Sequence, residues 1–203
     1  MHKSDFQELV RRFESEERNQ YQKPQEVMQH LESIFRNHSK EAPAFAGGWQ
    51  GLKVADLGAG TGYFSFRMVK QGASVIALDI DERFLDYIRA RPEYQDYKDR
   101  LETRKVEAQS IGLKPAEVNV IFSVNVYHHI DDRIDYFREA RMGLSEQGML
   151  IIIDFKQGEM PVGPPENIKL PEDQVVRELQ DAGFDVSVDH MLEYQNIYLA
   201  VKR

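Results

Sequence analysis

Residues 54–65 read Val54-Ala-Asp-Leu-Gly-Ala-Gly-Thr-Gly-Tyr-Phe-Ser65, a short apolar run that ends near an acid and continues into three alternating glycines. Glycine adopts backbone angles that other residues avoid, and it lets a ligand lie against the main chain. A strand, a glycine turn and a helix in this order also present unpaired backbone amides at the start of the helix. The stretch therefore predicts a strand-to-helix turn that holds a small ligand.

A second acid supports this interpretation. Asp79 comes directly after the apolar run 75–78, as Asp56 comes within the run before the glycines. In a nucleoside-binding βαβ unit, an acid lies about 20 residues beyond the glycine turn and accepts hydrogen bonds from a ribose. A turn that serves only the packing of a strand against a helix does not account for this second acid. Asp81 is better placed than Asp79 to cap the helix that follows.

From residue 52 onward, apolar runs alternate with helical stretches, a pattern typical of α/β proteins with a parallel sheet covered on both faces. Residues 1–45 instead show helical periodicity, broken at Pro43, and predict a helical appendage or lid ahead of a ligand-binding domain at 46–203. We expect strands at 52–57, 74–79, 101–106, 118–124, 148–154, 184–188 and 196–201. We expect helices at 61–71, 82–91, 132–143 and 171–183.

Composition narrows the possible partners. The chain has 203 residues, a net charge of −8 and no cysteine, which excludes disulfides and thiolate chemistry. An acidic chain without a dense basic cluster is a poor electrostatic match for nucleic acid. The N-terminal sequence contains no apolar run typical of a signal peptide, so a cytoplasmic location is expected, and no segment is apolar enough to span a membrane.

The spacing Asp-x-Gly-x-Gly-x-Gly from Asp56 to Gly62, together with Asp79, resembles the class I S-adenosylmethionine (SAM)-dependent methyltransferases. The resemblance implies a Rossmann-like, seven-stranded, mostly parallel sheet with helices on both faces, whose seventh strand runs antiparallel between the fifth and sixth. It implies SAM as cofactor and S-adenosylhomocysteine as product. The cofactor-binding residues that it implies are Asp56, Gly58, Ala59, Gly60, Gly62, Asp79, Ile80, Glu107, Ala108 and Asn125. Glu107 departs from the family's usual Gly-Asp-Ala at the third strand tip.

Residues 123–131, at the fourth strand tip, read Ser-Val-Asn-Val-Tyr-His-His-Ile-Asp. They resemble a motif of small-molecule methyltransferases of the ubiquinone-biosynthesis type and contain no Pro-Pro-Tyr motif of the kind that holds an amide or an adenine amine. The resemblance implies a small-molecule acceptor. His128 is the candidate general base because an imidazole titrates near neutral pH, and Tyr127 is expected to shape the pocket. The alternative for the two histidines is one packed under the cofactor loop and one in solvent.

Three further residues are candidates for binding the acceptor. Arg18 and Tyr21 belong to an Arg-x-x-Tyr-Gln-x-Pro element at 18–24 that resembles one in a bacterial subgroup of the family, and Lys156 follows the fifth strand. No metal is implied, and the oligomeric state is left open. Two other functions remain possible from the sequence: a SAM-binding partner or regulatory protein without catalysis, and an NAD(P)-binding oxidoreductase. The second is disfavoured because Tyr63 stands where GxGxxG has its last glycine.

Overall fold

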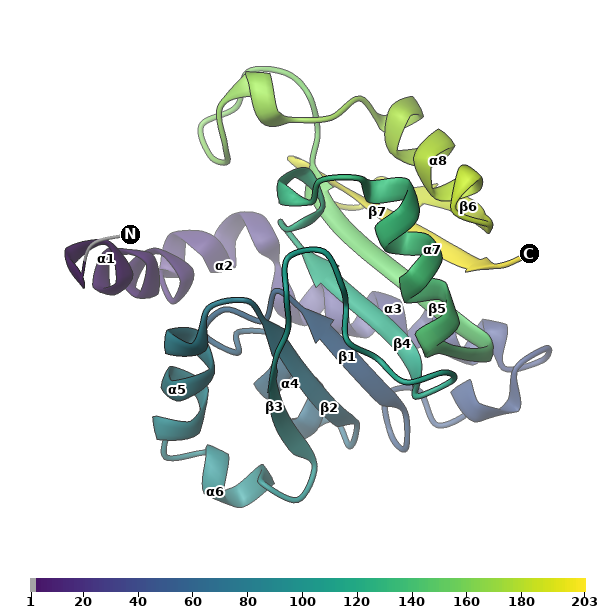
Figure 1. Ribbon diagram of the computed structural model, residues 1–203, viewed down its shortest axis with the longest axis horizontal. Coiled ribbons are helices and arrows are strands. Elements are labelled where there is room, and N and C mark those ends of the chain that lie inside the picture. The colour runs from purple at the N-terminus through teal and green to yellow at the C-terminus, as the bar shows by residue number, and fades with distance from the viewer. Residues whose placement is uncertain (1–2) are drawn as a thin grey trace. The chain divides into compact units, whose positions relative to one another are not determined.

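The computed structural model describes residues 3–203, which form two compact units that meet in sequence between Lys105 and Val106 (Figure 1). Each unit contains a portion of β-sheet with helices packed against it. The units are described separately below.

The first unit begins with helices and continues into three parallel strands. β2 lies in the middle and pairs in parallel with β1 and with β3. Both α4 and α5 pack against β2, and α5 also contacts β3. The helices are α1 (Lys3–Phe13), α2 (Glu16–Gln22), α3 (Pro24–His38), α4 (Ser65–Lys70), α5 (Glu82–Ala90) and α6 (Tyr94–Tyr97), with a 3-10 turn η1 (Pro43–Phe45). The strands are β1 (Lys53–Leu57), β2 (Ser74–Asp79) and β3 (Leu101–Lys105).

α3 contributes part of the core of this unit. Proline at its first position suits a helix start, and its apolar residues recur on one face. Val27, Leu31 and Phe35 on that face are fully buried. The ring of Phe35 meets Trp49 edge-on at 4.8 Å between centroids, and Trp49 Nε1 donates a hydrogen bond to the Met28 carbonyl at 3.0 Å. The indole is thus buried with its one polar group satisfied.

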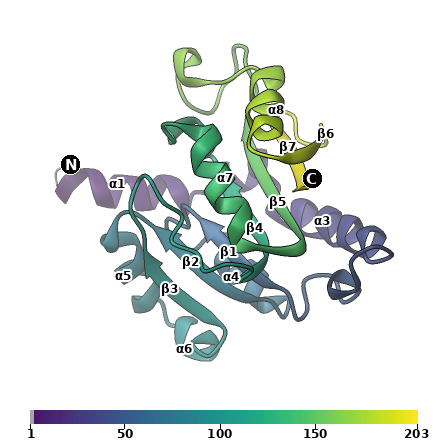
Figure 2. The same ribbon diagram turned by 45° about the vertical axis from the view of Figure 1, so that its right-hand side comes forward.

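The second unit holds four strands in the order β4-β5-β7-β6. β4 and β5 pair in parallel, whereas β7 runs antiparallel to both β5 and β6. Helix α7 packs on β5, and α8 packs on β6 and β7 (Figure 2). The strands are β4 (Val118–Val124), β5 (Leu144–Phe155), β6 (Phe184–Asp189) and β7 (Gln195–Lys202). The helices are α7 (Arg133–Gly143) and α8 (Glu172–Asp181), with 3-10 turns η2 (Tyr127–His129) and η3 (Glu166–Ile168).

The predicted fold class is confirmed. The part of the chain that the structure describes contains seven strands, mostly parallel, with the last strand antiparallel between the fifth and sixth. β2 and β5 each contain an unbroken run of buried residues, and because successive side chains point to opposite faces, both faces of these strands are covered. Between residues 3 and 203, no helix has the length and apolarity that crossing a membrane requires.

Candidate cofactor and catalytic site

The glycine loop connects β1 to α4 and has the backbone that its sequence predicts. Gly58, Gly60 and Gly62 all have positive φ, at 71°, 53° and 79°, which L side chains rarely adopt. The Gly58 amide donates to the Leu78 carbonyl at 2.9 Å and so fastens the loop to the end of β2. Thr61 lies fully buried in the loop, and its Oγ1 has no hydrogen-bond partner.

The two predicted acids are both buried at strand ends beside this loop. Asp79 Oδ2 accepts from the Gly60 amide at 2.9 Å, and its Oδ1 accepts from the Asp81 amide at 2.9 Å. Asp56 Oδ2 accepts from Ser65 Oγ at 2.5 Å. Burial raises the pKa of Asp56 to about 6, against the opposing hydrogen bond from Ser65 and the nearby charge of Arg18. Burial likewise raises the pKa of Asp79.

Ile80 follows Asp79 and is a large apolar side chain that is 59% exposed. An exposed apolar side chain beside a buried carboxylate is suited to cover the flat face of a purine whose ribose binds that carboxylate. The open backbone of the glycine loop, the two carboxylates and this apolar side chain therefore suit the three chemical parts of SAM: the amino acid, the ribose and the adenine.

The N-terminal helices contact the same loop. A Cβ at Gly60 would lie 3.3 Å from the ring of Phe13, so the end of α1 covers this glycine. Arg18, in α2, stacks over the ring of Tyr63 at 4.0 Å from its centroid and donates to the Phe13 carbonyl at 3.0 Å. Tyr63 in turn donates its hydroxyl proton to Asn19 Oδ1. Sequence reasoning missed Phe13 and Tyr63; the only signal was an aromatic residue directly after the third glycine.

Arg18 and Tyr21 therefore lie by the glycine loop in the first unit. Burial lowers the pKa of Arg18, and its charge acts on Tyr21, Tyr63 and Asp56. Burial raises the pKa of Tyr21. These neighbours place Arg18 beside the glycine loop, and its predicted contact with the acceptor stays a prediction.

In the second unit, His128 and Asp154 form a buried pair. His128 Nδ1 is 2.7 Å from Asp154 Oδ1, and the His128 backbone amide donates to Asp154 Oδ2 at 3.1 Å. The His128 side chain is 4% exposed. An ionised carboxylate only accepts hydrogen bonds, so Nδ1 carries the proton and Nε2 is left as the acceptor. Nε2 forms no hydrogen bond within residues 3–203. The neighbouring His129 is largely exposed, and the desolvation of the part that is covered, followed by the nearby His128, lowers the pKa of its ring.

Tyr127 lies in the core of the second unit. Its side chain is fully buried, its ring stacks on Phe137 at 5.1 Å, and its hydroxyl donates to Glu178 Oε2 at 2.7 Å. Arg133 forms an ion pair with the same carboxylate at 2.6 Å. This geometry gives Tyr127 a structural function between α7 and α8.

Two amide side chains lie near the end of β5 and β7. Asn125, with φ 60°, accepts at Oδ1 from Gln195 Nε2 at 2.5 Å. Asn196 lies opposite Asp154 in the β5–β7 ladder and is buried. Its Nδ2 donates to Glu172 Oε2 at 2.9 Å, so its Oδ1 points away from that carboxylate, and this oxygen has no partner. Sequence reasoning missed Asn196, because only the pairing of β5 with β7 places it beside Asp154.

Three further predicted residues lie in the second unit with local surroundings of their own. Lys156 Nζ donates to the carbonyls of Leu192 and Glu193 at 2.8 and 3.2 Å. Glu107 and Ala108 are exposed in a turn closed by a bridge between Glu107 and Ser110. Among the residues described, no group of three metal-ligating side chains is placed to hold an ion.

Comparisons with known proteins agree with this geometry. Residues 55–152 match the family profile described as a methyltransferase domain. The chain is 28% identical, over 156 residues, to a probable S-adenosylmethionine-dependent methyltransferase of Mycobacterium tuberculosis; the match covers 74% of this chain and 55% of that protein. It is 23% identical over 162 residues to a ubiquinone biosynthesis O-methyltransferase of Leptothrix cholodnii, covering 71% and 68% of the two chains.

A solved structure shares the fold over the full length of both chains. It is a SAM-dependent methyltransferase from Aquifex aeolicus, with a TM-score of 0.79 and 23% sequence identity, and the match covers 100% of each chain. In contrast, the chain spans a little over half the length of the mycobacterial relatives that it matches.

Proposed function

Because the chain belongs to the class I SAM-dependent methyltransferases, we propose that it transfers the methyl group of SAM to a hydroxyl or an amine of a small molecule. The observation that carries the proposal is the glycine loop fastened by Asp79, with Asp56 buried beside it. Such a loop lets a ligand lie against the main chain beside two carboxylate acceptors.

We assign the cofactor to groups of the first unit. Asp79 accepts hydrogen bonds from the ribose hydroxyls, and Ile80 covers the adenine. The glycines of the loop let the amino acid end lie against the main chain, and the carboxylate of Asp56 meets its ammonium group. Glu107, Ala108 and Asn125 stay predicted cofactor contacts from the second unit.

Arg18 fits the cofactor better than the acceptor. Its desolvated guanidinium and the desolvated Asp56 carboxylate influence one another without forming an ion pair. The amino acid end of SAM carries a carboxylate and an ammonium group. Its carboxylate pairs with Arg18, and its ammonium group pairs with Asp56. Since Arg18 belongs to α2, we propose that α1 and α2 form the lid of the cofactor site. α3 is excluded from the lid because it fills the core.

The polar groups near His128 support an acceptor that donates hydrogen bonds. Asp154 and the unpartnered Oδ1 of Asn196, which lies opposite Asp154 in the β5–β7 ladder, are both acceptors. The nearby cations are engaged elsewhere, Arg133 with Glu178 and Lys156 with backbone carbonyls. A carboxylate or phosphate at this place would meet like charge without a free cation, whereas a phenol, an alcohol or an amine finds partners.

The protein needs to supply only proton transfer, orientation of the nucleophile and exclusion of water. SAM supplies a methyl group already activated by its positively charged sulfur, so no metal or covalent residue is required. His128 Nε2 takes the proton that the acceptor hydroxyl or amine loses as its new bond to the methyl carbon forms. Asp154 holds the imidazole in the required tautomer and stabilises its charge once it is protonated. The protein also excludes water and orients the nucleophile.

The proposal is tested by incubating the full chain with SAM and measuring release of S-adenosylhomocysteine. The panel contains catechols, phenols and primary amines. It also contains carboxylic acids of similar size, which the proposal predicts not to be methylated. Turnover with a hydroxyl or amine compound, reduced in Asp79→Ala at SAM concentrations that do not saturate the variant, is the expected result. Turnover confined to carboxylic acids would overturn the acceptor class, and binding of SAM without turnover on a broad panel would favour a non-catalytic SAM-binding protein.

A further inference from the structure

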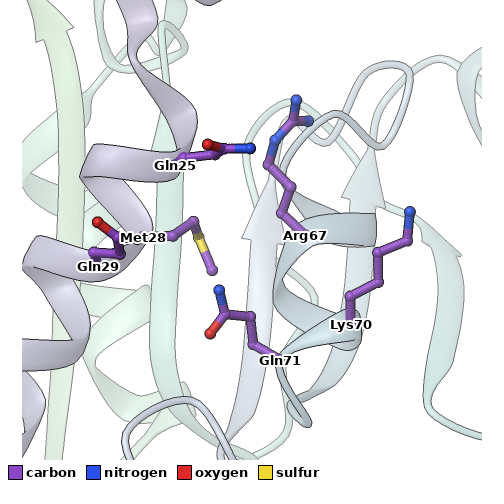
Figure 3. Close-up of a pocket in the computed structure, with 6 residues that line it drawn as sticks. All are labelled: Gln25, Met28, Gln29, Arg67, Lys70 and Gln71. Atoms are coloured by element: carbon purple, nitrogen blue, oxygen red, sulfur yellow. The ribbon is translucent and has the colours of Figure 1, made fainter.

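A groove of about 570 Å³ lies between α3 and α4 in the first unit, outside the glycine loop (Figure 3). α3 contributes two glutamines and a methionine, and α4 with its C-terminal cap contributes two cations and a glutamine. Figure 3 shows the Gln25 amide pointing toward Arg67, and Met28 and Gln71 pointing toward one another from the two helices. The lining residues are Gln25, Met28, Gln29, Arg67, Lys70 and Gln71.

The charge of this groove contrasts with that of the chain. The protein carries a net charge of −8, yet the lining contains two cations and no acid. Lys70 forms no hydrogen bond or ion pair with the described part of the chain. Arg67 donates to the Tyr63 carbonyl and stacks over the Tyr63 ring at 3.9 Å, which leaves most of its five N–H donors unused.

The other lining groups suit a polar ligand with an apolar face. The three glutamine amides each offer donors and an acceptor, and Met28, only 1% exposed, forms an apolar floor. Gln25 lies in the first turn of α3, a 15-residue helix whose N-terminal end carries a partial positive charge. A second groove of about 350 Å³ shares Gln25, Gln29 and Arg67 and extends toward Lys23 and Glu26, which face one another at 3.9 Å.

We propose that this groove binds a small organic anion, a carboxylate or a phosphate ester with a hydrogen-bonding body. Its volume lies within the range of small-molecule sites. Arg67 and Lys70 pair with the anionic group, the glutamines bind the polar body, and Met28 contacts its apolar part. The site goes beyond methyl transfer, because no residue in its lining belongs to the cofactor or acceptor groups assigned above.

Trp49 provides a reporter that does not depend on methyl transfer. It is the only tryptophan of the chain, and its Nε1 donates to the backbone carbonyl of Met28, the floor of the groove. The full chain is titrated with citrate and, separately, with glycerol 3-phosphate, at ionic strength held constant with sodium chloride. The second readout is the set of glutamine side-chain amide signals in ¹⁵N spectra. We expect a saturable change in one or both readouts.

Matched variants locate the binding. Lys70→Gln is expected to weaken the anion at least tenfold, whereas Lys40→Gln, an exposed lysine just beyond α3 and outside the groove, leaves it unchanged. Saturation by citrate alone identifies a carboxylate site, and saturation by glycerol 3-phosphate alone identifies a phosphate site. The proposal is overturned if neither probe changes either readout, or if Lys70→Gln binds as wild type does. Binding of S-adenosylhomocysteine is measured separately. If it is normal while the anion does not bind, only the groove proposal fails and the methyltransferase proposal stands.

Discussion

Asp56 makes binding at the glycine loop dependent on pH. Burial raises its pKa from the usual 3.8 to about 6, so between these values the folded protein holds a proton that the unfolded chain has lost. The contribution of Asp56 to the free energy of unfolding therefore falls as pH rises through this window and is constant above it. The affinity for the cofactor instead rises with pH through the same window, because the ammonium group of the ligand pairs with the ionised carboxylate.

We predict that affinity for S-adenosylhomocysteine falls roughly tenfold for each pH unit below about 6. Calorimetry from pH 5 to 8 measures this directly. Asp56→Asn, of nearly the same shape, should bind more weakly at pH 8 and lose the dependence. A wild-type affinity that is flat across this range would show that Asp56 does not meet the charged amino group.

His128 and Asp154 are predicted to act as a unit. His128→Gln removes the proton acceptor, and Asp154→Asn removes the carboxylate that fixes the tautomer at 2.7 Å from Nδ1. Each change should lower kcat by about 10²- to 10⁴-fold with any acceptor found by the panel. Affinity for S-adenosylhomocysteine should be unchanged, since neither side chain belongs to the glycine loop. Full turnover in His128→Gln would instead make the pair structural.

Ring contacts, the hydrogen bond from Tyr63 to Asn19 and the ion pair of Arg91 with Glu14 at 3.2 Å help to hold α1 and α2 in place. Phe13 stacks on Phe84 at 5.6 Å and covers Gly60, and Asn19 accepts from Tyr63. If these helices close over the cofactor, S-adenosylhomocysteine should slow proteolysis at residues 14–23 in wild type. Phe13→Ala should reduce that protection and weaken binding several-fold, while Arg11→Ala, exposed on the same helix, serves as the control. Equal cleavage with and without the ligand would rule out a lid.

α7 and α8 are joined through Glu178. Burial alone would raise its pKa, but hydrogen bonds from Arg133, Gln174 and Tyr127 hold it at about 2. The stability that this carboxylate contributes is complete above its usual pKa of 4.5 and is lost as pH falls toward 2.

Glu178→Ala leaves the Tyr127 hydroxyl and the Arg133 guanidinium without their partner. We predict a loss of about 2–4 kcal/mol in the free energy of unfolding at pH 7, measured by urea denaturation. Glu178→Gln, which keeps an acceptor for Tyr127, should lose less. The difference between wild type and Glu178→Ala should shrink as pH falls below 4.5, and a difference independent of pH would contradict the ion-pair account.

For the molecule as a whole, strands were the most predictable feature. β2 and β4 have the predicted bounds because each is a short apolar run between polar residues. The helix predicted from residue 61 begins only at Ser65, since positive φ at Gly60 and Gly62 keeps the chain in a turn. Residues 1–45 were predicted to be helical as a whole, but a separate helix at Glu16–Gln22 was not predicted, because that segment has no apolar stripe and is held by tertiary contacts of Arg18 and Asn19.

The site was predictable to the same degree. Asp56, Asp79 and His128 follow from their positions at strand ends, which sequence spacing fixes. The contact of Phe13 with Gly60, the pairing of His128 with Asp154 and the place of Asn196 opposite Asp154 join residues distant in sequence. Such contacts cannot be predicted from the local sequence pattern alone. The burial of Tyr127 depended in the same way on α8, which supplies Glu178.

The central claim is that the glycine loop and its two acids bind the adenosyl cofactor. Calorimetric titration of the purified full chain with S-adenosylhomocysteine, after removal of bound nucleoside, tests it most directly. The account predicts saturable binding at one site per chain, weakened roughly 10- to 100-fold in Asp79→Ala through loss of charge-assisted hydrogen bonds. No heat of binding in wild type, or equal affinity in Asp79→Ala, would contradict it.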